Sequence, residues 1–160
     1  MANRLSRYVA KINRGPRFLR SFLLTRLFCS QVKFANTAGV TLVDVSESQV
    51  LLTLANKKRV QNHIGGIHAV AAALLAESAT GLILGMNIPS DRLPLLKSMT
   101  LNYYKRMQGN LTAKAYLTEA QRLQIQQQEK GDLTIAVELT DESGQEPIVA
   151  QMQWAWISKK

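Results

Sequence analysis

Hydrophobic and polar positions follow two different periods along the chain. Between Ala69 and Leu84 nearly every side chain is apolar, and the exceptions are Glu77, Ser78 and Thr80. A helix that is apolar on every side is buried rather than half-exposed. This run therefore predicts one long, buried, central helix that begins near Gly66.

The segments on both sides of this run alternate with the period of two that is typical of strands. Turn-forming residues separate them: a loop over Asn87 to Pro94, a turn at Gly109-Asn110 and a hairpin turn over Asp141 to Gly144. Arg122 to Lys130 fits either an extended segment or a short helix. The expected strands are Val40 to Asp44, Gln49 to Leu54, Leu96 to Arg106, Leu111 to Leu117, Leu133 to Leu139 and Ile148 to Trp156.

Two strands, one buried helix and a run of antiparallel strands make an α+β layout. About 19 helical residues span roughly 28 Å, which is close to the width of about six strands spaced ~4.8 Å apart. The helix can therefore lie across the concave face of one curved sheet. A transmembrane interpretation is disfavoured, because Glu77 at the centre would cost ~2.5–3.5 kcal/mol on insertion.

The carboxylate of Glu77 is the feature that this layout does not explain. A buried charge costs free energy unless a partner or a reaction uses it. His68 lies nine residues before Glu77, which on a helix is roughly 14 Å along the axis and about half a turn around it. One chain cannot bring these two side chains together, so a site that uses both predicts a dimer.

Composition narrows the class of protein. A chain of 160 residues with 46% hydrophobic residues fits a globular domain with a proper core. The single cysteine, Cys29, is expected to be buried; it rules out an intrachain disulfide and favours a reducing, cytoplasmic location. With only two histidines beside it, no metal site is expected.

The net charge of +9 is concentrated at one end of the chain. Residues 1–33 carry eight Lys and Arg and no acid, which leaves 12 basic against 11 acidic residues in 34–160. We therefore divide the chain into a basic helical leader, residues 1–33, and a domain, residues 34–160. Two helices separated by Gly15-Pro16 fit the leader.

Three interpretations of the leader stay open. The helices can pack on the domain, make a peripheral contact with an anionic membrane, or act as an Arg-rich transit peptide. A secretory signal is disfavoured because Arg26 interrupts the apolar stretch. Nucleic-acid binding is not expected, because no recognition motif accompanies the charge.

The residues around the helix start resemble a known family. Asn62-x-x-Gly65-x-x-His68-Ala69, followed by Leu75-Ala76-Glu77, resembles the core signature of hotdog-fold acyl-CoA thioesterases of the phenylacetate-pathway (PaaI) type. That family typically has Asn-x-x-Gly-x-x-His-Gly-Gly and an acid nine residues after the His. The resemblance covers about Gly39 to Ile157 and is greatest to an uncharacterised branch that also has basic N-terminal helices. It implies a hotdog fold, in which a curved antiparallel sheet wraps a long central helix.

The resemblance also implies an activity, namely hydrolysis of acyl-CoA or acyl-carrier thioesters by a homodimer, or a tetramer, with the active site at the dimer interface. Glu77 of the partner chain would be the general base or the nucleophile, Asn62 would orient water or the carbonyl, and His68 would polarise the site. The backbone N–H of Ala69 would stabilise the oxyanion. No cofactor is implied, since coenzyme A is part of the substrate.

Each role has a structural alternative. Glu77 can be a structural carboxylate, Asn62 a cap of the turn, and His68 the donor or acceptor of a structural hydrogen bond. The basic candidates for coenzyme A phosphates can equally form a solvated face. The further substrate-binding candidates are Gly65, Gly66, Ser98, Lys57, Lys58, Arg59, Lys105 and Arg106.

One departure from the family pattern bears on turnover. Ala69-Val70 replaces the Gly-Gly pair after the histidine, which keeps both N–H groups but narrows access for a thioester. The alternative function is therefore a non-catalytic acyl-CoA-binding or interaction protein on the same scaffold. A hotdog dehydratase ranks last, because the Pro-Gly start of its helix is missing.

Overall fold

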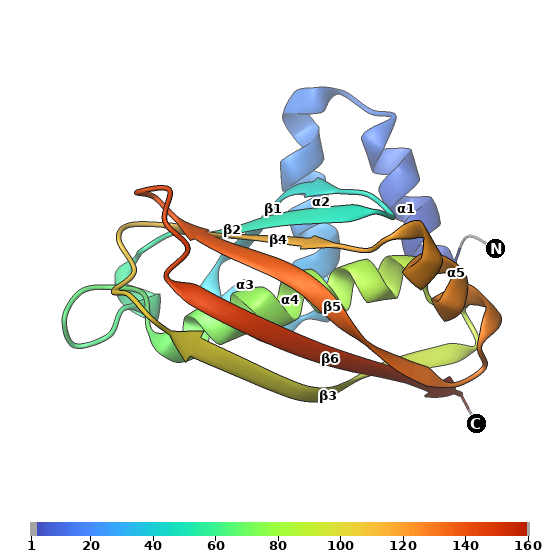
Figure 1. Cartoon of the computed structure of the whole chain (residues 1–160). Coiled ribbons are helices and arrows are strands. Elements are labelled where there is room, and N and C mark those ends of the chain that lie inside the picture. Colours follow the sequence, from blue (N-terminus) through green and yellow to red (C-terminus); the bar gives the residue numbers. More distant parts are fainter. Residues whose placement is uncertain (1–2, 160) are drawn as a thin grey trace.

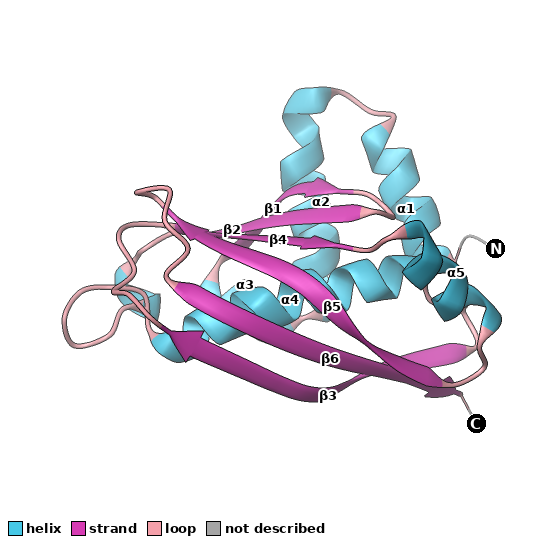
Figure 2. Cartoon of the chain, viewed as in Figure 1, coloured by secondary structure: helices cyan, strands magenta, loops and turns pink. Residues whose placement is uncertain are grey.

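A six-stranded antiparallel sheet curves around one long helix (Figures 1 and 2). The structure is a computed structural model and describes residues 3–159. The sheet has the order β1-β2-β4-β5-β6-β3, so that β1 and β3 are its edges. The elements are α1 (Arg4–Asn13), α2 (Arg17–Gln31), α3 (Lys33–Ala38), β1 (Val40–Val45), β2 (Gln49–Leu54), the 3-10 turn η1 (Lys58–Val60), α4 (Ala69–Asn87), β3 (Arg92–Tyr103), β4 (Leu111–Tyr116), α5 (Glu119–Gln127), β5 (Gly131–Asp141) and β6 (Ile148–Ser158).

The central helix α4 lies across the inner face of this sheet, as the sequence predicts, and the α+β hotdog layout is confirmed. Leu75, Ile83 and Leu84 of α4 are fully buried. By length and hydropathy alone α4 could also span a membrane, but most of it is buried inside the fold. Core helices of this kind pass the same test, so it carries little weight.

The indole of Trp154 sets how closely α4 approaches the sheet. The indole Nε1 of Trp154 donates to Thr80 Oγ1 at 2.9 Å, in the buried interior. Gly81, one residue further, leaves room for the same indole, since a Cβ there would lie 2.8 Å from its Cη2 atom. The polar residue and the glycine in the apolar run are therefore both explained by the ring they face.

The expected loop over Asn87 to Pro94 is partly wrong, because β3 already begins at Arg92. Pro94 pairs with Trp156 at the edge of the sheet, and an edge strand tolerates a proline because one side of the strand needs no donor. The ambiguous segment Arg122 to Lys130 is helical as far as Gln127, as part of α5, which begins at a capping box between Thr118 and Gln121. The short helix α3 was not predicted.

The two N-terminal helices were predicted from the Gly15-Pro16 break, and they form a hairpin that projects beside β1 (Figure 1). Two hydroxyl groups fix α2 to β1: Ser21 Oγ donates to the Leu42 carbonyl at 2.6 Å, and Thr25 Oγ1 accepts from the Leu42 N–H at 2.9 Å. Cys29 is buried, as expected. Val9 and Leu24 belong to the same hydrophobic core as the sheet and α4.

Asn3 joins the first helix to the end of the central one. Its Oδ1 accepts from the Ser6 N–H at 2.8 Å and so caps α1. Its Nδ2 donates to the carbonyls of Gly85 at 2.7 Å and Ile88 at 2.6 Å. Carbonyl groups in the last turn of a helix have no partner within it, and here the leader supplies one.

Candidate functional site

The predicted site residues before α4 form a tight turn. Asn62 Oδ1 accepts from the N–H groups of Ile64 and Gly66, both at 3.1 Å. The Asn62 N–H donates to the Gly66 carbonyl at 2.8 Å. Gly65 has a φ of 77°, a left-handed conformation that favours glycine. Asn62 and Gly65 therefore shape the turn that aims the chain into α4.

His68 caps the N-terminus of α4. Its Nδ1 accepts from the Val70 N–H at 3.1 Å, and its backbone carbonyl accepts from Ala71 and Ala72. A ring nitrogen that accepts carries no proton, so in the neutral imidazole the other nitrogen, Nε2, is the donor. The side chain is exposed, so this N–H can reach a ligand at the helix start.

The Ala69 N–H is the first of the helix, and it has no acceptor among the described residues. Such free N–H groups at the positive end of the helix dipole attract an anion or a developing oxyanion. The carbonyl of Ala69 accepts from the Tyr103 hydroxyl at 2.7 Å, and burial raises the pKa of that phenol. The sequence analysis did not single out Tyr103 as a site residue. Its contact with Ala69 depends on where the end of β3 lies relative to α4, which the sequence pattern does not show.

Glu77 lies two turns further along α4. It is half-buried, and no hydrogen bond or ion pair holds its carboxylate within the described part of the chain. Burial raises the pKa of this carboxyl group. The sequence prediction of an acid stranded in apolar surroundings agrees with this environment.

Glu77 borders an apolar cavity of about 260 Å³ between the leader, α4 and the sheet. Ser78 beside it is buried, and its hydroxyl has no hydrogen-bond partner among residues 3–159. The sequence analysis did not predict that the N-terminal helices form one wall of this cavity. The apolar side chains that line it include Leu5 of α1, Leu27 and Phe28 of α2, Pro94 of β3 and Trp154 of β6.

His68 borders a different hollow, of about 360 Å³, between α3 and the first turns of α4, with Phe34 and Arg59. The cavity of Glu77 and the hollow of His68 share no residue. Nine residues of helix separate the two side chains by roughly 14 Å along the axis. Within one chain the structure therefore does not bring His68 and Glu77 together.

The basic candidates surround the turn before α4. Lys57, Lys58 and Arg59 precede it and are exposed. From the other side Arg106 donates to the Ile64 carbonyl at 2.9 Å, and the neighbouring Lys105 donates to Gln145 Oε1 at the same distance. A positive surface therefore flanks the helix start, as phosphate binding would need.

The remaining candidates take simple places in the structure. Gly66 is buried in the turn, where a Cβ would lie 3.7 Å from the Met107 carbonyl oxygen. Ser98 is exposed on β3 and donates to Gln153 Oε1 at 3.3 Å. In residues 3–159 no cluster of three or more His, Cys, Asp or Glu side chains could hold a metal ion.

One family model matches most of the chain. Residues 20–157 match the model of a family described as a domain of unknown function, DUF4442. No curated protein matches the chain.

Solved structures match more widely. PA5026 from Pseudomonas aeruginosa, a protein of unknown function described as a probable thioesterase, is 24% identical with a TM-score of 0.77, over 86% of this chain and 95% of that one. The thioesterase HI1161 from Haemophilus influenzae is 16% identical with a TM-score of 0.69, over 84% and 88%. A mutant of the thioesterase PA1618 from Pseudomonas aeruginosa is 14% identical with a TM-score of 0.70, over 84% and 94%. At these identities the likeness shows the fold, and it confirms the predicted hotdog thioesterase-like structure.

Proposed function

We propose, since the chain belongs to the DUF4442 family and has the fold of thioesterases, that it hydrolyses acyl-CoA or acyl-carrier thioesters at a site shared by two copies. The observation that carries the proposal is Glu77, a half-buried carboxylate at the border of an apolar cavity, with no partner in the part of the chain that the structure describes. A carboxyl group with a raised pKa in a cavity is a candidate for acid–base chemistry. The free Ala69 N–H is the complementary group for the developing charge.

The cavity beside Glu77 supports an apolar acyl or aryl group as the part of the substrate that is buried. An apolar cavity of about 150 Å³ holds one benzene ring. By that measure the cavity of about 260 Å³ takes a group of roughly ten carbon atoms. The basic residues around the helix start would hold the phosphates of coenzyme A.

The edge strand β3 supports a dimer. It runs over 12 residues, from Arg92 to Tyr103, and within residues 3–159 it pairs with β6 alone. Its exposed side chains include Leu93, Leu95 and Met99. A long, apolar, unprotected edge is a site for pairing with another strand, and a second copy of β3 is complementary to it under two-fold symmetry.

In such a dimer one chain would supply the helix N-terminus and the other the acid. The thioester oxygen accepts from the Ala69 N–H, while the partner subunit's Glu77 takes a proton from water. The water oxygen then bonds to the carbonyl carbon, the carbon–sulfur bond breaks, and the proton passes to the leaving thiolate. The His68 Nε2–H can donate to the same oxyanion or to the water.

The direct test is release of thiol from a panel of short, long and aryl acyl-CoA substrates. Glu77→Gln should lower the rate about 100-fold or more, as expected when a general base is lost. If the wild-type protein hydrolyses none of the panel, or if the variant keeps the full rate, the proposal is wrong.

A second variant tests the oxyanion donor without breaking the helix. Ala69 is the first residue of α4, where proline is compatible with a helix, and His68 before it has the extended conformation that a following proline requires. Ala69→Pro removes this donor and leaves the helix intact, so the rate should fall about 100-fold. Glu119→Pro is the matched control, since Glu119 holds the same position in α5 after an extended Thr118.

Mixing the two inactive variants tests the shared site. A heterodimer of Glu77→Gln and Ala69→Pro chains has one site with both defects and one intact site. Half of the randomly mixed dimers are heterodimers, so about a quarter of the wild-type activity should return. If no activity returns although heterodimers form, each site lies within one chain.

Val70 favours the second candidate function, a non-catalytic acyl-CoA-binding protein. Its side chain is 58% exposed on the first turn of α4, beside the N–H that a thioester must reach. Acyl-CoA that binds tightly, competes with free coenzyme A and is not hydrolysed would favour this function. Substitution Val70→Gly would then separate the two, because it widens access and should raise turnover only in an enzyme.

A further inference from the structure

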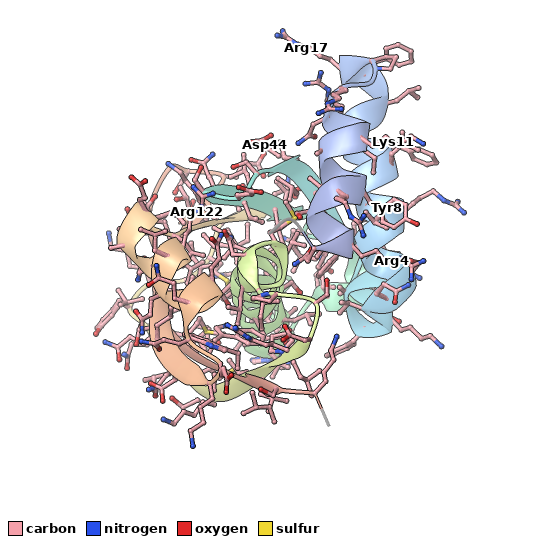
Figure 3. The ribbon with its side chains drawn as sticks, turned by 90° about the vertical axis from the view of Figure 1, so that its right-hand side faces the viewer. Arg4, Tyr8, Lys11, Arg17, Asp44 and Arg122 are labelled. Atoms are coloured by element: carbon pink, nitrogen blue, oxygen red, sulfur yellow. The ribbon has the colours of Figure 1, made fainter. Side chains whose placement is uncertain are left out.

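The outward side of α1 carries an unbroken basic stripe. Arg4, Arg7, Lys11 and Arg14 follow at intervals of three and four residues, which places them on one face of a helix. All four are exposed. Figure 3 shows Arg4, Tyr8 and Lys11 pointing away from the sheet, with Arg17 at the tip of the hairpin.

The helix α2 exposes apolar side chains as well. Phe18, Leu19, Phe22 and Leu23 are 83%, 38%, 58% and 40% exposed. The Arg26 guanidinium lies 5.8 Å from the centre of the Phe22 ring. Phe18 is the most exposed large apolar side chain of residues 3–159. Exposed rings of this size on a projecting helix are typical of an interaction surface.

The charge of this hairpin is not neutralised within the described residues. Residues 1–33 contain no acid, and none of the ion pairs found in residues 3–159 involves a leader residue. Arg20, the least exposed cation of the hairpin, donates to the Gly15 carbonyl at 3.1 Å and steadies the turn. The hairpin therefore presents a strong positive field together with apolar side chains.

We propose that this surface, which we call the outer face (Arg4, Arg7, Lys11, Arg14, Phe18, Leu19, Phe22 and Leu23), docks on an anionic lipid bilayer. Basic and apolar side chains exposed on one projecting hairpin match a headgroup layer above hydrocarbon, where the rings insert and the cations stay at the phosphates. A nucleic acid would satisfy the cations but leave the leucines and phenylalanines in water. A convex, projecting hairpin also fits the deformable surface of a bilayer better than it fits a pocket on another protein.

The inner side of the same hairpin connects docking to the cavity. Leu5 of α1 and Leu27 of α2 line the cavity of Glu77. Docking would therefore hold an apolar cavity next to the phase into which apolar acyl groups partition. Binding to lipid does not depend on hydrolysis, so this inference and the proposed function fail separately.

Sedimentation of the full chain with vesicles tests the inference. The protein should bind vesicles of phosphatidylcholine containing about one third phosphatidylserine, bind pure phosphatidylcholine weakly, and be released by salt. Arg7→Gln with Lys11→Gln should lower the partition coefficient about 25-fold. Phe18→Ser with Phe22→Ser should lower it about tenfold or more for each ring.

Matched controls separate the outer face from general charge and hydrophobicity. Lys114→Gln with Lys130→Gln removes the same charge elsewhere, and Leu123→Ser removes an exposed apolar side chain of α5. These controls should bind vesicles as the wild type does, with unchanged circular dichroism. Equal losses in the controls, or no binding to anionic vesicles, would overturn the inference.

Two further readings make the test specific to this surface. In the variant Phe18→Trp, brominated lipids should quench the fluorescence of the new indole. The two native tryptophans, Trp154 and Trp156, are only 6% and 0% exposed, so their fluorescence should not be quenched. An absence of quenching in bound protein would contradict the inference. Light scattering provides the second reading. If the double variant Phe18→Ser, Phe22→Ser dissociates an oligomer of the wild type, a second copy covers the outer face and the inference is wrong.

Discussion

At the scale of single residues, Glu77 carries a conflict between stability and reactivity. Its carboxyl group borders an apolar cavity and has no ion-pair partner in the described residues, and burial raises its pKa. Folding therefore favours the neutral acid, whereas a general base must be ionised. Proteins commonly accept such a cost at a functional site.

The first prediction concerns the rate. Hydrolysis should require ionised Glu77, so the rate should rise with pH through the folded pKa, which lies above the ordinary value of about 4.3. The measurement is thiol release from one acyl-CoA against pH, with sedimentation at each pH to confirm the assembly. A rate that stays flat through the acid range would show that Glu77 is not the base.

The second prediction concerns stability. Because the folded pKa of Glu77 is raised, its favourable contribution is complete below the unfolded value of about 4.3 and is lost as the pH rises through the folded pKa. Glu77→Gln should therefore melt above the wild type at pH 7, by about 2–4 °C for each kcal/mol regained, and the gap should close near pH 4. A variant that melts lower at pH 7 would mean that the carboxylate has a stabilising partner, which an interface would supply.

At the scale of elements, the packing of α4 on β6 depends on a glycine of the helix, Gly81. A Cβ at Gly81 would lie 2.8 Å from Trp154, whereas one at Gly85 would make an ordinary 3.4 Å contact with Leu5. Two glycines of one helix therefore have opposite expected responses to the same substitution. This is the third prediction.

Gly81→Ala should destabilise the fold by about 1–3 kcal/mol through overpacking. Gly85→Ala should stabilise it by about 0.5–1 kcal/mol, because alanine loses less backbone entropy in a helix. Urea unfolding of both variants beside the wild type measures the difference. Equal effects would show that the indole of Trp154 moves aside easily.

The helices and strands also show how much of the fold could be predicted from the sequence. The period of two located most strands, and the apolar run located α4 and singled out Glu77, because both patterns are local. The start of β3 was missed, since Pro94 looks like a loop residue until its place on an edge strand is known. The contact of Tyr103 with Ala69 and the cavity wall from Leu27 join segments far apart in the sequence, which periodicity does not encode.

At the scale of the whole molecule, the proposed activity requires a second copy. The candidate donor and the candidate acid lie at separate places on one helix, and β3 offers the surface that would align two helices. The fourth prediction follows from this arrangement. Leu95→Lys places a charge on the exposed edge and should weaken the dimer about 30-fold or more, with loss of activity.

Light scattering after gel filtration measures the assembly of this variant. Val149→Lys is the matched control, because Val149 is similarly exposed on β6, where both neighbouring strands are already present. The control should remain a dimer and keep its activity. If Leu95→Lys also stays dimeric, β3 is not the interface.

Asn3 has a consequence for proteolytic trimming of the chain. The amide that caps α1 also supplies the donor for two carbonyls at the far end of α4. A protease that cut before Lys33 would strip away that donor and open the wall formed by Leu27 and Phe28. The shortened product would lose one wall of the cavity and the donor at the end of its central helix in the same event.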